Sequence, residues 1–293
     1  MKSNFTENFN GAKSGGFIYT ATLILFLIIS LVGRTVLTAI NVSDTAYYAV
    51  SSLFSVSAFL CAACFYARFN RGKRFFTKFA PVYVVPSFLL AAGMFLGLGF
   101  LNELVAEGVK SVGGVVPNVE IPLDTPFQYI LFTVLLCVFP AIAEEIFFRG
   151  VLTERLSGVK TAAGVFTVAL CFALYHGSVA QLFYQFIYGV GLGFLTLKAK
   201  SVIPAIVAHF INNFAVLSFE YFNVSVDLTN TVLIIIGSAI LVNFVLFLIF
   251  YDKKPRAERA CTENIKDFYI PFGFIGVAVA VLLIVLSALP LAA

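Results

Sequence analysis

Long apolar runs fill most of the chain, and they limit what it can fold into. A helix that crosses a bilayer needs about 20 mainly apolar residues, and its backbone polar groups must be hydrogen-bonded within the helix. Of the 293 residues, 60% are hydrophobic and only 12% are charged. We therefore predict an all-α fold, a polytopic transmembrane helical bundle of about eight or nine spans. The expected spans are 17–40, 46–67, 80–101, 126–152, 161–176, 181–197, 202–221, 230–251 and 268–290.

No break in composition divides the chain, so we predict one membrane domain over residues 1–293. The longest expected connection between spans is 102–125, which contains the turn-rich stretches GGVVP and EIPLDTP. This connection either joins two helices or covers one mouth of the bundle.

Lysine and arginine are unevenly distributed among the gaps between the predicted spans. Basic loops stay on the cytoplasmic side of a membrane, which predicts a cytoplasmic amino terminus and an outer 102–125 loop. The same topological cause explains the basic loops, so we expect the lipid bilayer and no nucleic acid as a partner. Short loops favour a bacterial cell membrane. Apart from Lys110, the basic residues of the gaps are Lys2, Lys13, Arg68, Arg71, Lys73, Arg74, Lys78, Arg155, Lys160, Lys198, Lys200, Lys253, Lys254, Arg256, Arg259 and Lys266.

Three charged residues stand inside a predicted span, in the stretch AEEIFFRG at 143–150. A charge at the centre of a span costs about 3 kcal/mol, so such residues usually mark a function or a structural ion pair. On a helix, Glu145 and Arg149 are four residues apart and can pair, whereas Glu144 projects about 100° away. This division leaves Glu144 as the candidate base that faces a cavity.

Both histidines of the chain also fall on predicted spans, at His176 and His209. His209 and Asn213 are four residues apart, so an imidazole and a carboxamide share one helix face. Such a pair can donate hydrogen bonds to a developing oxyanion. Phe172 shares a face with His176 in the same way.

These segments resemble the CPBP family, which comprises the CAAX prenyl proteases and bacteriocin-processing enzymes and is also described as the Abi family of intramembrane proteases. The motif EExxxR appears as Glu144, Glu145 and Arg149, FxxxH as Phe172 and His176, and HxxxN as His209 and Asn213. The resemblance covers about 126–222, which we take as the catalytic core within the membrane domain.

The resemblance implies an intramembrane endopeptidase in which Glu144 and His176 activate a water and His209 and Asn213 stabilise the oxyanion. Glu145, Arg149 and Phe172 would support the site. Its substrate would be a membrane-associated peptide or protein that arrives from the membrane or the cytoplasmic side.

Three questions stay open at this stage. Two histidines and a glutamate can hold a catalytic zinc, yet a glutamate base acting directly on water needs no metal. Intramembrane charges also build transporters, although no inverted repeat is visible in the chain. A non-catalytic immunity or scaffold protein could keep the same polar residues as a structural network.

Overall fold

The computed structural model describes residues 11–70, 76–117, 120–251 and 261–290. Within these ranges every regular element is a helix, and no strand occurs. Eight of the helices are long and apolar enough to cross a membrane. The predicted all-α bundle of eight or nine spans is therefore confirmed. The eight helices are Ala12–Ala39, Asp44–Arg68, Pro81–Ser111, Pro126–Arg155, Leu182–Ala199, Ile203–Tyr221, Thr231–Phe250 and Lys266–Ala288.

The segment predicted as a span at 161–176 is shorter than the others. It forms α9 (Thr161–Tyr175), a 15-residue helix that is about 22 Å long at 1.5 Å per residue. The hydrocarbon core of a bilayer is about 30 Å thick, so α9 ends inside the bundle. Its carboxyl end is thereby placed among the other helices, where a polar residue can serve an internal site.

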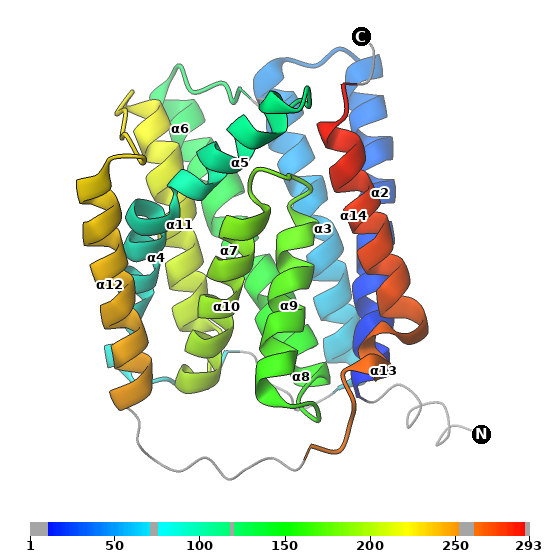
Figure 1. Ribbon diagram of the computed structural model, residues 1–293. Helices are drawn as coiled ribbons and strands as arrows, with labels where there is room; N and C mark the ends of the chain where they lie inside the picture. The colour runs from blue at the N-terminus through cyan, green and yellow to red at the C-terminus, as the bar shows by residue number, and fades with distance from the viewer. Residues whose placement is uncertain (1–10, 71–75, 118–119, 252–260, 291–293) are drawn as a thin grey trace.

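The expected loop at 102–125 begins later than predicted. After α4 (Val84–Leu98) the chain continues as α5 (Phe100–Ser111), which runs at an angle across one end of the bundle in Figure 1. Leu101, Leu104 and Val105 alternate with polar residues at helical spacing, and this amphipathic pattern explains why the helix continues beyond the apolar run.

The bundle is assembled from neighbouring pairs of helices. In Figure 1, α2 (Ala12–Ala39) lies beside α14 (Phe274–Ala288) at one side of the molecule, and α4 lies beside α12 (Thr231–Phe250) at the other. α10 (Leu182–Ala199) packs against α9 and also against α11 (Ile203–Tyr221). α3 (Asp44–Phe69) packs against α2.

Basic residues gather at one end of the bundle. Lys13 lies in the first turn of α2, Arg68 in the last turn of α3, and Lys198 in the last turn of α10. Figure 1 draws these helix termini at the lower end. Lys110 is at the opposite end, in the last turn of α5. This arrangement agrees with the predicted uneven distribution of lysine and arginine among the connections between spans. Eight members of the predicted set lie outside the described residues: Lys2, Arg71, Lys73, Arg74, Lys253, Lys254, Arg256 and Arg259.

Candidate active site

The helix that carries the first motif is distorted before the motif and again within it, at Arg149. It begins as α6 (Pro126–Phe132), with a capping box between Thr125 and Gln128. Two π-helical segments, η2 (Thr133–Val138) and η3 (Ile146–Leu152), flank α7 (Phe139–Glu145), and the short α8 (Thr153–Arg155) completes the helix. Insertions of this kind occur frequently at functional sites, because they change the direction in which side chains project.

Glu145 and Arg149 form the ion pair that their spacing predicts. Arg149 Nη1 donates to Glu145 Oε1 at 2.8 Å, and both side chains are 0% exposed. Arg149 Nη2 also donates to the backbone carbonyl of Gly189 on α10, at 3.3 Å. Two charges in a hydrocarbon interior are costly unless they are paired and hydrogen-bonded, so each of these side chains offsets the burial cost of the other.

His209 joins the same carboxylate. Its Nδ1 lies 3.0 Å from Glu145 Oε1, and the side chain is 3% exposed. Because a carboxylate can only accept, we assign the proton to Nδ1, which leaves Nε2 of His209 free for another partner. Glu145 thus accepts from Arg149 of the first motif and from His209 of the third motif.

His176 is anchored through the same ring nitrogen. Its Nδ1 lies 2.9 Å from the backbone carbonyl oxygen of Phe172, and a carbonyl also only accepts, so Nδ1 again carries the proton. α9 ends at Tyr175, and Gly177 has φ +64°, a conformation that a glycine adopts without strain at a helix end. The helix therefore stops directly behind His176, whose half-buried ring presents Nε2.

Phe172 connects the three motifs. Its ring lies edge-on to both imidazoles, with centroid distances of 4.7 Å to His176 and 5.8 Å to His209. On the same ring, the guanidinium carbon of Arg149 lies 4.3 Å from the centroid, within the range of a cation–π contact. A fully buried phenylalanine thus brings the predicted site residues together.

The remaining predicted residues, Glu144 and Asn213, are half-buried. Glu144 forms no hydrogen bond or ion pair with another residue that the structure describes, and in particular none with His176. Asn213 Nδ2 donates to the backbone carbonyl of Leu136 at 3.3 Å. The site therefore has a buried side, formed by Glu145, Arg149, Phe172 and His209, and a partly accessible side, formed by Glu144, His176 and Asn213.

Sequence reasoning missed the contribution of α10. The Tyr184 hydroxyl donates to Asn212 Oδ1 at 2.6 Å, and the ring centroid of Tyr188 lies 6.4 Å from that of His209. The Tyr188 hydroxyl is buried and has no hydrogen-bond partner among the residues that the structure describes. The stretch YQFIYG could have indicated this contribution. Its two tyrosines are four residues apart, and such spacing places two phenols on one face of a span.

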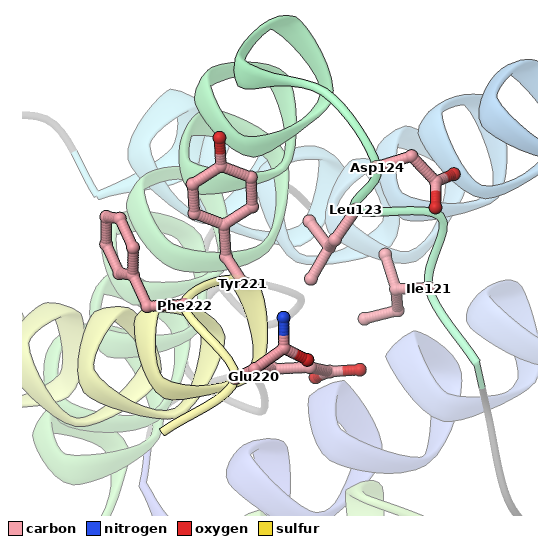
Figure 2. A pocket seen from close by; sticks show the side chains of 7 residues that line it. Ile121, Leu123, Asp124, Glu220, Tyr221 and Phe222 are labelled. Carbon is pink, nitrogen blue, oxygen red and sulfur yellow. The ribbon is translucent and has the colours of Figure 1, made fainter.

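A pocket of about 600 Å³ opens at the end of the bundle where α11 stops. In Figure 2 the side chains of Ile121, Leu123 and Asp124 come from the segment before α6, and those of Glu220 and Tyr221 come from the end of α11. Glu220 is seven residues beyond Asn213, which is about 10 Å along a helix. None of the lining residues belongs to the three motifs, so this pocket is separate from the candidate site.

The described side chains were also compared with the ligand sets that hold metal ions. In the ranges that the structure describes, no group of three or more His, Cys, Asp or Glu side chains is arranged to hold a metal ion. The two histidines and Glu144 therefore do not form a ready-made zinc site.

Comparison with known families identifies the segment that carries the motifs. The model of the family described as "Type II CAAX prenyl endopeptidase Rce1-like" matches residues 126–215. This match confirms the resemblance inferred from the three motifs, and it includes every residue of the candidate site. No curated protein and no solved structure matches the chain.

Proposed function

We propose that the protein is an intramembrane endopeptidase, because residues 126–215 of this integral membrane chain match the model of the Rce1-like family of type II CAAX prenyl endopeptidases. The supporting observation is the Phe172 ring, which brings the two imidazoles and Arg149 into one cluster. The substrate class we propose is a peptide or protein associated with the membrane, entering from the bilayer or from the cytoplasmic side.

Glu144 is the proposed base. It is the half-buried carboxylate of the pair, and it has no protein partner among the described residues, whereas Glu145 is occupied by Arg149 and His209. Glu144, assisted by Nε2 of His176, takes a proton from a water whose oxygen attacks the peptide carbonyl carbon. The same proton then passes to the leaving amine as the C–N bond breaks.

His209 and Asn213 are the proposed oxyanion donors. The Glu145 carboxylate accepts from His209 Nδ1, which fixes the orientation of the imidazole ring. A proton on Nε2 of that ring can then be donated to the developing oxygen anion. Asn213 has a second N–H in addition to the one that meets Leu136. Donors placed where charge develops lower the barrier most in a site that excludes water.

The test is cleavage of a quenched peptide library by detergent-purified protein. We expect Glu144→Gln to lower kcat by about 10²-fold to 10⁴-fold, because a general base contributes a factor of that size. His176→Ala should show a loss in the same direction. A chelator should leave the wild-type rate unchanged, since the proposed base acts on water without an ion.

Glu107→Gln is the matched control, because Glu107 is an exposed carboxylate on α5 outside the site. Cleavage in water enriched in oxygen-18 should place one labelled oxygen in the new carboxylate. Equal cleavage by wild type, Glu144→Gln and Glu107→Gln would assign the activity to a contaminant and reject the proposal.

A further inference from the structure

Three side chains form a hydrogen-bonded relay that reaches Asn213 from α10. The Tyr184 hydroxyl donates to Asn212 Oδ1 at 2.6 Å, and Asn212 Nδ2 donates to Asn213 Oδ1 at 3.4 Å. The relay ends where Asn213 Nδ2 donates to the Leu136 carbonyl at 3.3 Å. Tyr184 is 5% exposed and Asn212 is 6% exposed, so the bond between them is shielded from water.

The direction of the relay is determined at the Leu136 carbonyl. A backbone carbonyl only accepts, so the amide end of Asn213 must face it. If the Asn213 carboxamide were reversed, its oxygen would face the Leu136 oxygen and its nitrogen would face Asn212 Nδ2. Two oxygens, both acceptors, would then face each other at Leu136, and two N–H groups, both donors, would face each other at Asn212. Neither contact could then be a hydrogen bond.

Tyr184 completes the relay at its other end. Asn212 Oδ1 is buried and needs a donor, and the Tyr184 hydroxyl supplies it. With its oxygen held there, Asn212 keeps its Nδ2 turned toward Asn213 Oδ1. The remaining N–H of Asn213, on its half-buried side chain, is used by neither of these protein partners.

We propose that Tyr184 and Asn212 are positioning residues that hold the Asn213 carboxamide with an N–H directed at the substrate carbonyl oxygen. This inference rests on the proposed endopeptidase function. It extends that function by assigning the orientation of one oxyanion donor to a helix outside the three motifs. An oxyanion donor must be held in place before the reaction, because reorganisation during the reaction raises the barrier.

The test is a double-mutant cycle on the purified full-length protein, with kcat and KM measured for a cleaved library peptide. We expect Tyr184→Phe to lower kcat roughly threefold to tenfold with KM unchanged, the size expected for one neutral hydrogen bond. In the Asn213→Ala background the same change should have no further effect, because Tyr184 acts only through Asn213.

Tyr129→Phe is the matched control. Its hydroxyl also binds α11, through Ser218 Oγ at 2.9 Å, and it touches no residue of the three motifs. We expect Tyr129→Phe to keep the wild-type kcat. The inference is overturned if Tyr184→Phe behaves like Tyr129→Phe, or if its effect multiplies in full with that of Asn213→Ala.

A second measurement separates this inference from the proposed function. The measurement is an NMR spectrum of protein with nitrogen-15 in the asparagine side chains, in which the Asn213 amide signal is assigned by its loss in Asn213→Asp. We expect the chemical shift of this signal to change in Tyr184→Phe and to stay the same in Tyr129→Phe. If the wild-type protein cleaves no peptide, the proposed function fails. The Asn213 signal then still shows whether Tyr184 holds the Asn213 carboxamide through Asn212. An Asn213 signal that is identical in all these proteins would overturn the relay whatever the activity.

Discussion

At the scale of single residues, the two adjacent glutamates occupy different environments. Glu145 is fully buried and holds Arg149 and His209, whereas Glu144 is half-buried and has no hydrogen-bond partner among the described residues. Neighbouring carboxylates on a helix project about 100° apart, so one can serve the structure while the other faces a substrate. This division also predicts different consequences for the same substitution at the two positions.

We expect Glu145→Gln to destabilise the protein by about 3 kcal/mol or more, because it leaves the Arg149 guanidinium buried without an opposite charge. Glu144→Gln should change stability by less than about 1 kcal/mol, since no described contact is lost. Thermal unfolding of both variants in one detergent checks this expectation. Equal melting temperatures would show that the ion pair does not hold the helix in place.

At the scale of elements, glycines permit the closest helix contacts. Gly97 on α4 and Gly237 on α12 face each other, and a Cβ atom added to Gly237 would lie 2.5 Å from the Gly97 Cα. Helices in a membrane associate through close packing of small residues, because lipid supplies no hydrophobic drive between them. The α4–α12 pair therefore depends on the absence of these side chains.

We expect Gly237→Ala to lower stability by about 1–3 kcal/mol, because the added methyl group forces the two backbones apart. Gly108→Ala on α5 is the control, since a Cβ there meets nothing within 4 Å and alanine favours a helix by up to about 1 kcal/mol. Thermal melting in detergent measures both. A Gly237→Ala protein as stable as Gly108→Ala would contradict close backbone packing at this crossing.

At the scale of the whole molecule, charge determines orientation. Lys13, Arg68 and Lys198 lie at the end of the bundle where α2 begins and α10 ends, and basic termini of spans are retained in the cytoplasm. We propose that this end faces the cytoplasm of a bacterial cell and that the α5 end faces outward.

Labelling of single cysteines in intact cells checks this orientation. In a background with the exposed Cys61, Cys64 and Cys261 replaced by serine, an impermeant maleimide should label Ser111→Cys, which lies in the last turn of α5. Thr161→Cys, at the start of α9, should react only after the cells are opened. The reverse pattern would invert the topology.

The fold class and the Glu145–Arg149 pair could be predicted from the sequence because both depend on local rules. An apolar run long enough for a bilayer must become a helix, and two charges four residues apart on a helix are neighbours. The three motifs also identified the family over the segment that the family model matches. The continuation of α5 beyond residue 102 was missed because its amphipathic pattern is weaker than an apolar run.

The tertiary structure alone decided which residues from different helices meet. The Glu145–His209 bond joins residues 64 positions apart, and the Tyr184–Asn212 bond joins α10 to α11. Spacing along the chain cannot reveal such contacts, since they depend on how the helices pack and rotate against one another. The sequence by itself determined that the polar residues lie on helices in a membrane. Packing around Phe172 determined which of them lie together, because only the assembled bundle places those faces toward each other.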